Sequence, residues 1–271
     1  MKIILCLNQD IHSVTALNLL FPHLKNHQVK IILSQKVGKV DNLPLELQNL
    51  RQFEQGDLLS LFQKIDESKI NNFEQSKKFF TFKQIAQFFQ SEISFYGNIN
   101  SEIALNDFKE FAPDLIISIR FGQIFREQII SIPKHGIINL HSGILPNFRG
   151  IMPSFWAILN GESQIGTTLH YIENTGIDTG SIIGFSYFTP NKNLSLVFNI
   201  NKIYEGGCNL LVDNLDKILS GSKINSLQQS NLEGKYFSYP QDADINRFLD
   251  IAPLTKEEDM AWMLERWGSK N

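Results

Sequence analysis

Short apolar runs separated by amphipathic segments constrain the fold of this chain of 271 residues more than any other feature. Residues 3–7 read IILCL and residues 114–119 read DLIISI. Runs of this length are typical of strands buried on both faces of a parallel sheet. A helical pattern over residues 13–24, with Ser13 expected as the N-cap, leads to a second apolar run at 29–33. Because a β-α-β start implies a right-handed crossover, we predict an α/β fold: a Rossmann-like, mostly parallel twisted sheet with helices on both faces.

The turn that follows residues 3–7 contains no glycine, so the G-x-G-x-x-G fingerprint of dinucleotide folds is absent from it. We therefore exclude a nicotinamide or flavin site at this turn. Its backbone N–H groups could instead bind a phosphate of the substrate at the start of the helix, with Asn8, Gln9 and Ser13 as candidates. The alternative is a purely structural turn.

The region from residue 35 to 112 reads as polar and mostly helical. Apolar residues recur at helical spacing between 58 and 65, which indicates a stripe that faces the core. The polar residues just before this stripe are expected on the solvent side: Gln52, Glu54, Gln55 and Asp57. We also expect a short strand at 79–82 and a helix that closes before Pro113.

Residues 136–183 hold most of the polar chemistry of the chain. Asn139 and His141 follow an apolar pair, and in an extended strand they point to the same face. A short helix at 153–159 and a strand at 165–172 are expected next, before Asp178, which lies between two glycines. An amide, an imidazole and a carboxylate at neighbouring strand ends are suited to acyl transfer. Each has a simpler interpretation by itself, because a histidine at a strand end often only packs and an aspartate between glycines often forms a turn.

The motifs of this stretch occur together in one order: Asn-x-His, Leu-Pro, Arg-Gly, a helix with a tryptophan, Gly-x-Thr-x-His and Asp-x-Gly-x-Ile. Over roughly residues 113–188 the chain resembles the folate-dependent formyltransferases, and most closely the sugar-nucleotide N-formyltransferases. The resemblance implies that Asn139 and His141 polarise the formyl group and that Asp178 organises proton transfer, with His170 in support. It implies neither a covalent enzyme intermediate nor a metal.

The same resemblance implies a pocket for N10-formyltetrahydrofolate, the formyl donor, after the strand at 114–119. Ligands of open α/β sheets collect at the carboxyl ends of the strands. The residues implied for the co-substrate are Phe121, Gly122, Gln123, Ile124, Phe125 and Thr175. Arg149 and Gly150 are implied for the acceptor substrate. The simpler alternatives are an ordinary strand-to-helix turn for the first group and a surface salt bridge for Arg149.

The loop after His141 departs from the commoner family pattern, Pro-Ser-Leu-Leu-Pro, and reads Ser-Gly-Ile-Leu-Pro. We expect Gly143 to loosen this loop, which faces the incoming amine. The acceptor expected from the resemblance is the 4-amino or 3-amino group of a nucleotide-linked amino-dideoxy sugar of the dTDP-4-amino-4,6-dideoxyglucose type. Such a product belongs to O-antigen or lipopolysaccharide biosynthesis. The alternatives are glycinamide ribonucleotide or methionyl-tRNA as acceptor, a formyltetrahydrofolate hydrolase, and a binding module without catalysis.

A long amphipathic helix is predicted over residues 196–219 with Ser195 as its N-cap, and the glycine pair at 206–207 indicates a close helix approach or a kink. A strand at 236–240 and a helix at 243–249 are expected after it. We predict a catalytic domain over residues 1–220 and a small strand-containing appendage over 221–271. The resemblance implies that such a short tail builds a homodimer interface and that it is smaller than the C-terminal domain of methionyl-tRNA formyltransferases.

The formal net charge of −3 provides no basic footprint for nucleic acid, which argues against a tRNA partner. Cys6 and Cys208 lie in apolar segments, so we expect buried thiols rather than a disulfide. No stretch approaches the ~20 apolar residues of a membrane span, and the start does not read as a signal peptide. We therefore expect a cytoplasmic protein without a membrane partner. The remaining histidines form no ligand cluster in the sequence, so no metal site is predicted.

Overall fold

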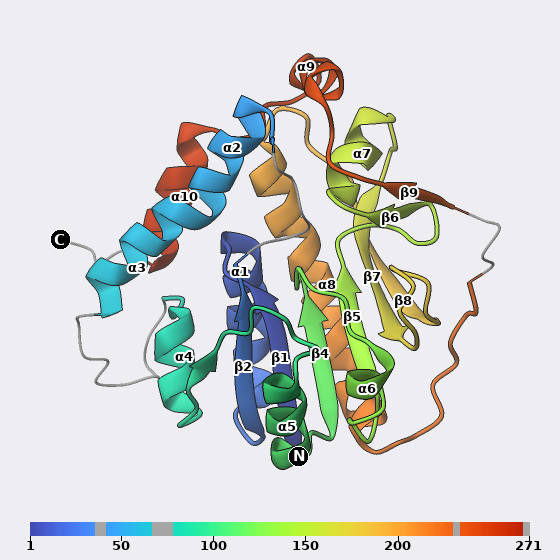
Figure 1. The fold of residues 1–271 in the computed structure, drawn as a ribbon. Coiled ribbons are helices and arrows are strands. Elements are labelled where there is room, and N and C mark those ends of the chain that lie inside the picture. Colours follow the sequence, from blue (N-terminus) through green and yellow to red (C-terminus); the bar gives the residue numbers. More distant parts are fainter. Residues whose placement is uncertain (36–41, 67–77, 230–233, 268–271) are drawn as a thin grey trace.

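The computed structural model describes residues 1–35, 42–66, 78–229 and 234–267. A seven-stranded sheet runs through it in the order β3-β2-β1-β4-β5-β7-β8 (Figure 1). The strands are β1 (Lys2–Asn8), β2 (Gln28–Ser34), β3 (Ile93–Ser94), β4 (Leu115–Ile119), β5 (Ile137–His141), β7 (Ile165–Ile172) and β8 (Ile182–Phe188). Pairing is parallel from β3 to β5 and antiparallel from β5 to β8. The predicted fold class, a mostly parallel Rossmann-like sheet, is confirmed.

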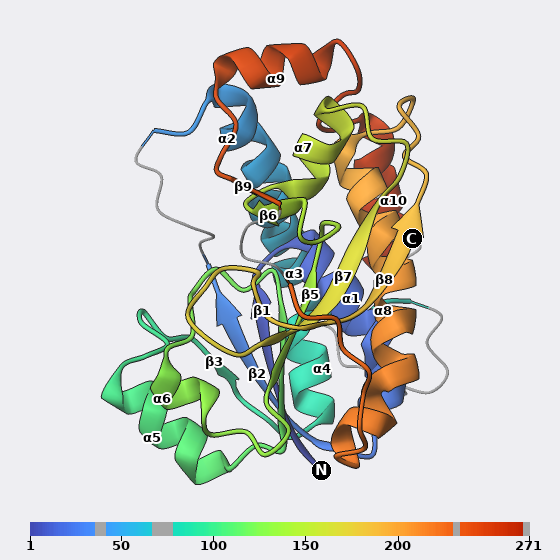
Figure 2. The same cartoon turned by 90° about the vertical axis from the view of Figure 1, so that its right-hand side faces the viewer.

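Alternate side chains of β1 enter two hydrophobic clusters on opposite faces of the sheet, as the pleat of a strand requires. Ile3, Leu5 and Leu7 face the cluster that contains α1 (Ile11–Leu24) and α8 (Leu196–Leu219). Ile4 and Cys6 face the cluster that contains α5 (Glu102–Phe111) and α6 (Glu127–Ile130). Figure 2 shows these two pairs of helices on opposite sides of the sheet. Every residue of β4 is buried, which explains its continuous apolar run.

The N-cap of the helix after β1 lies three residues earlier than predicted. Asp10, and not Ser13, is its N-cap, and the Asp10 Oδ1 atom accepts the Ser13 backbone N–H at 2.8 Å. Aspartate and serine are both good N-caps, so the local sequence is compatible with a helix start at either residue. The outcome is a tertiary one, because the Asp10 carboxylate is also paired with a distant arginine, Arg120.

The segment expected as a strand at 79–82 is instead the entry to a helix, α4 (Phe82–Phe88). Thr81 is its N-cap and forms a capping box with Gln84: the Thr81 hydroxyl accepts the Gln84 N–H, and the Gln84 side chain accepts the Thr81 N–H. A capping box of this kind satisfies two of the free N–H groups at the start of a helix. The aromatic residues around it therefore read as a strand by composition and fold as a helix start.

Two helical segments that precede and follow this region pack on each other. The segment before it consists of α2 (Leu45–Arg51), a π-helical turn η1 (Gln52–Asp57) and α3 (Leu58–Asp66). Helix α10 (Glu257–Trp267) was not predicted; the Trp267 ring lies 5.8 Å from that of Phe62, and its Nε1 donates to the Phe80 carbonyl at 3.1 Å. Among the helices of the described ranges, none combines the length and the apolar character that a membrane span requires.

Two C-terminal elements, β9 (Lys235–Phe237) and α9 (Asp242–Leu249), pack against β6 (Phe148–Gly150) and α7 (Pro153–Leu159). Strand β9 pairs in parallel with β6, and α9 packs on α7. Phe248 of α9 stacks on Phe155 of α7 at 4.3 Å, and both belong to the cluster that contains α1. The predicted bounds of α7, β7 and α8 are confirmed. The division at residue 220 and the homodimer stay predictions.

Candidate active site

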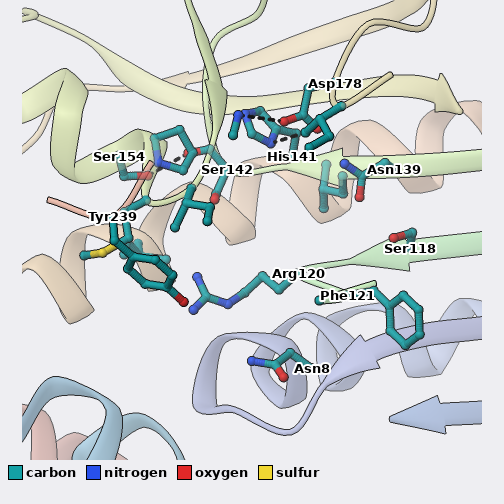
Figure 3. Close-up of a pocket in the computed structure, with 18 of the residues that line it drawn as sticks. Asn8, Ser118, Arg120, Phe121, Asn139, His141, Ser142, Ser154, Asp178 and Tyr239 are labelled. Atoms are coloured by element: carbon teal, nitrogen blue, oxygen red, sulfur yellow. Dashed lines mark hydrogen bonds and ion pairs between the residues drawn. The ribbon is translucent and has the colours of Figure 1, made fainter. Parts of the chain in front are cut away.

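A cleft of about 350 Å³ lies at the carboxyl ends of the parallel strands (Figure 3). Its walls come from the ends of β1, β4 and β5, the loop between β7 and β8, the α2–η1 segment, and two tyrosines of the C-terminal part, Tyr236 and Tyr239. A volume of this size is typical of a small-molecule site. The position is the one expected for ligands of an open α/β sheet.

The three residues singled out in the sequence lie together in this cleft. Asn139 and His141 extend from β5, and Asp178 comes from the loop after β7. The Asp178 Oδ1 atom is 3.5 Å from His141 Nδ1 and 3.6 Å from His170 Nε2. His170 Nε2 in turn is 3.1 Å from Asn139 Nδ2. The structure therefore places an amide, two imidazoles and a carboxylate in one connected group.

Hydrogen bonds determine which nitrogen of His170 carries its proton. His170 Nδ1 lies 2.8 Å from the backbone carbonyl of Tyr171, which can only accept, so Nδ1 is the donor. In the neutral ring Nε2 then carries the lone pair and accepts an N–H from Asn139. An amide group has two N–H donors, and the second one of Asn139 is left for a ligand oxygen.

His141 makes the corresponding contact through its other nitrogen. Its Nε2 donates to the Phe148 carbonyl at 2.7 Å, so Nδ1 is the atom that gains or loses a proton beside Asp178. Burial lowers the pKa of His141 below its ordinary value, although Asp178 and the Phe148 carbonyl act in the opposite direction. At neutral pH we therefore expect a neutral His141 imidazole.

At Asp178 the neighbouring groups outweigh the effect of burial on the pKa. Burial by itself would raise the pKa of this carboxyl, but His141, His170 and the Gly150 N–H, which donates to Oδ2 at 2.9 Å, together lower it to about 2. The carboxylate is ionised at neutral pH. Its backbone has a left-handed conformation with φ of 55°, which is uncommon for a residue with a side chain.

The residues expected for the folate co-substrate mostly line the cleft. Phe121, Gly122, Gln123, Ile124 and Phe125 form one wall of it, and the rings of Phe121 and Phe125 stack at 5.4 Å. The Gln123 side chain is already engaged with the protein: it accepts the Ile99 N–H at 2.6 Å and donates to the Tyr96 carbonyl at 2.8 Å. Thr175 does not line the cleft, although Asn174 and Gly176 on either side of it do.

The structure does not bring together the residues expected for a phosphate site at the start of α1, and that site stays a prediction. Asn8 lines the cleft, but Gln9 and Ser13 do not. The Ser13 N–H is bonded to the Asp10 carboxylate, and the Gln9 N–H donates to the Ser34 carbonyl at 2.8 Å. A carboxylate therefore occupies the helix start and would repel a second anion there.

Of the two residues expected for the acceptor at 149–150, only Gly150 lines the cleft. The Nε atom of Arg149 is buried and has no hydrogen-bond partner within the described residues. The expectation that Gly143 loosens its loop is also wrong. A Cβ atom there would lie 2.5 Å from Pro153 Cβ and 2.9 Å from the Phe148 carbonyl oxygen, so the missing side chain permits close packing.

The cleft wall also contains a charged cluster that the sequence did not predict. Arg120, with φ of 55°, directly follows β4, and its Nε is 2.8 Å from Asp10 Oδ2. Its Nη2 is 3.2 Å from Glu54 Oε2, and the other Glu54 oxygen is 2.9 Å from His12 Nε2. Glu54 thus faces the interior, contrary to the solvent-side expectation. The position of Arg120 at the carboxyl end of a buried strand could have indicated a site residue. Nothing in the sequence around Glu54 indicated that it would pair with Arg120.

Cys6 and Cys208 are buried free thiols, as expected. Within residues 1–35, 42–66, 78–229 and 234–267, no group of three or more His, Cys, Asp or Glu side chains is arranged to hold a metal ion.

Comparison with known proteins finds a family match over part of the chain. Residues 62–189 match the family model described as formyl transferase. The methionyl-tRNA formyltransferase of Clostridium tetani is 37% identical over 135 residues, which are 50% of this chain and 43% of that protein. The chain thus matches less than half the length of this curated relative.

Two solved structures have the same fold. A 4-N formyltransferase from Francisella tularensis superposes with a TM-score of 0.58 and 19% identity over 92% of this chain and 86% of that one. An N-formyltransferase from Helicobacter canadensis, in complex with folinic acid and dTDP-3-aminofucose, superposes with a TM-score of 0.55 and 23% identity. The match covers 90% of this chain and 72% of that one. At these identities the likeness establishes the fold. Asn139, His141, His170 and Asp178 all lie within residues 62–189, the segment that matches the formyl transferase family model.

Proposed function

We propose that this protein transfers a formyl group from N10-formyltetrahydrofolate to the amine of a nucleotide-linked amino-dideoxy sugar, of the dTDP-4-amino-4,6-dideoxyglucose type. The observation that carries the proposal is the connected group of Asn139, His141, His170 and Asp178 at the floor of a cleft of small-molecule size. The formyl transferase match over residues 62–189 supports the same reaction class.

In the proposed reaction the amine nitrogen attacks the formyl carbon, forming a C–N bond and a tetrahedral intermediate with a negatively charged oxygen. The second N–H of Asn139 is the donor assigned to that oxygen, and His170 orients the amide through its lone pair. Collapse of the intermediate breaks the bond to N10 of the folate. The amine loses one proton and N10 gains one, so the products are the formamide and tetrahydrofolate.

We assign to Asp178 the transfer of the proton that the amine loses. A carboxylate with a pKa of about 2 holds a proton only briefly, so its role is to pass the amine proton on through water or His141. His141, neutral at rest, can accept a proton at Nδ1, and the imidazolium then faces the Asp178 carboxylate at 3.5 Å.

The donor side of the cleft suits a flat, partly apolar ring system. Phe121 and Phe125 stack along one wall, and Ile124 is 52% exposed beside them. Large apolar side chains left exposed at a cleft are typical of ligand sites. The Helicobacter canadensis protein, solved with folinic acid and dTDP-3-aminofucose, supports both the donor and the acceptor class.

The acceptor side favours a small molecule over tRNA. Among the residues that the structure describes, the cations on the cleft wall are Arg51 and Arg120, and Arg120 is already paired with two carboxylates. Nucleic-acid sites instead present clustered, unpaired Lys and Arg side chains. Tyr236, 48% exposed, and Tyr239 offer aromatic surface for a nucleotide base.

Methionyl-tRNA is the second candidate acceptor, since the curated relative from Clostridium tetani is a methionyl-tRNA formyltransferase. The test is to incubate the protein with N10-formyltetrahydrofolate and separate acceptors: amino-sugar nucleotides, glycinamide ribonucleotide and methionyl-tRNA. We expect the added formyl mass on an amino-sugar nucleotide, and none with the Asn139→Ala variant. Formylated methionyl-tRNA alone would replace the proposed acceptor, and formate release without any acceptor would replace transfer by hydrolysis.

A further inference from the structure

The loop that carries Asp178 is contacted by a segment that follows α8 in the sequence. Leu227 exchanges two backbone hydrogen bonds of 2.8 Å with Ile182, the first residue of β8. The next two residues of this segment, Gln228 and Gln229, then reach the loop with their side chains. Residues 227–229 thus contact the end of this loop and the start of β8, and they lie outside the segment that matches the family model.

Gln229 makes the more direct contact with Asp178. Its Nε2 donates to the backbone carbonyls of Asp178, at 3.0 Å, and Gly180, at 2.6 Å. The reversed amide would set an oxygen against two carbonyl oxygens, so these partners determine the orientation of the side chain. Gln228 acts one step away, because it donates to Ser181 Oγ at 2.8 Å, which is also bonded to Glu173.

These contacts matter because the backbone of Asp178 is in a costly conformation. A non-glycine residue with φ of 55° persists only where its surroundings hold it there. On one side the carboxylate accepts the Gly150 N–H at 2.9 Å, and on the other the Asp178 carbonyl accepts the Gln229 amide. The side chain and the backbone of Asp178 are thus held from two separate parts of the chain.

We propose that Gln229 is a positioning residue for formyl transfer: its amide holds the left-handed backbone of Asp178, so that the carboxylate stays between His141 and His170. The inference rests on the proposed function for its kinetic consequence, but its structural consequence can be measured without any substrate. It adds a positioning residue to the residues beyond 220 that line the cleft, Tyr236 and Tyr239.

Two substitutions of similar size test the proposal by turnover. Gln229→Met removes both hydrogen bonds, and we expect kcat to fall by about 10- to 100-fold at every pH, because a shift of ~1 Å at a reacting group can cost on the order of 100-fold. Gln229→Glu can donate one hydrogen bond when protonated but repels both carbonyls when ionised. Its kcat relative to the unchanged protein should therefore fall as the pH rises from 5 to 8.

The matched controls are Gln87→Met and Gln87→Glu, at an exposed glutamine on α4, and both should leave kcat and its pH dependence unchanged. A Gln229→Met variant within twofold of the unchanged protein would overturn the proposal. So would a Gln229→Glu variant whose relative kcat does not depend on pH, because a purely packing role would be insensitive to that ionisation.

A second measurement stands apart from catalysis. Carbon-13 NMR of the Asp178 carboxyl should show a pKa of about 2 in the unchanged protein. In Gln229→Met the carboxylate should lose its alignment with His141 and His170, and its pKa should rise toward 3.8. An unaltered value in Gln229→Met refutes the positioning role even if the protein is an active formyltransferase. An altered value supports it even if no acceptor is found, in which case only the proposed function fails.

Discussion

Replacing Asp178 with asparagine should lower the free energy of unfolding at acidic pH, once His141 is protonated, because the folded site then stabilises a negative charge at this position. The side chain is 10% exposed, accepts the Gly150 N–H, and faces His141 and His170, whose positive charge, when present, favours the carboxylate. Asparagine has nearly the same shape and can still accept the Gly150 N–H through its oxygen. The substitution therefore removes the charge and leaves the packing almost unchanged.

The size of the effect follows from the pKa of the carboxyl. Folding lowers the pKa from 3.8 to about 2, and a difference of one pKa unit corresponds to about 1.36 kcal/mol. The ionised form is therefore favoured in the folded protein by about 2 to 3 kcal/mol. This is a large share of the 5–15 kcal/mol that separates typical folded and unfolded states.

The sign of the pH dependence is determined by the lowered pKa. The contribution of the ionised carboxyl is present above the unfolded value of 3.8 and is lost as the pH falls through about 2. Because His141 is neutral at pH 7 and gains its charge only below pH 6.5, urea unfolding of the two proteins should give a small difference at pH 8, the largest difference near pH 4 to 5, and a narrower one again toward pH 3. Asp213→Asn, at an exposed carboxylate of α8, is the control and should change stability little.

Equal or greater stability of Asp178→Asn at pH 4.5 would refute this reasoning. That result would mean that burial of the charge outweighs its three neighbours, as occurs at active sites that sacrifice stability for activity. The pKa of Asp178 would then have to lie above its ordinary value. Direct titration of the carboxyl separates the two cases.

Three further predictions follow from the geometry of the cleft. Asn139→Ala should reduce kcat by about 100- to 1000-fold in the formyl-transfer assay with little change in melting temperature, and an undiminished kcat would exclude it as the oxyanion donor. Because burial lowers the pKa of His141 below 6.5, kcat/KM should be level down to about pH 6.5 and decrease only below it, and a midpoint above 6.5 would contradict a neutral resting imidazole. Gly150→Ala, at φ of 93° and with its Cβ 2.2 Å from the Phe237 carbonyl oxygen, should cost about 1–3 kcal/mol in urea unfolding, whereas Gly97→Ala, with open space around it, should cost far less.

Periodic patterns in the sequence were sufficient to predict those strands and helices whose conformation depends mainly on their own residues. The wholly apolar run of β4 and the amphipathic stripe of α8 predicted buried elements, since strand and helix burial leave a direct trace in residue spacing. The glycine pair at 206–207 also lies where α8 approaches β7 and β8: a Cβ atom at Gly207 would be 2.5 Å from Thr167 Oγ1. The order of the motifs in residues 136–183 likewise indicated which side chains would meet.

Long-range contacts decided the remainder, because no local pattern encodes them. The choice of Asp10 over Ser13 as the N-cap depends on Arg120, more than a hundred residues later, and Glu54 faces inward for the same partner. Two features of the Asp178 site were equally hidden: the Gly150 N–H that its carboxylate accepts, and the Gln229 amide that its carbonyl accepts. The residue types of the site were legible in the sequence, since the chemistry needs them, but their protonation states and support depend on atoms that only folding brings within hydrogen-bond distance.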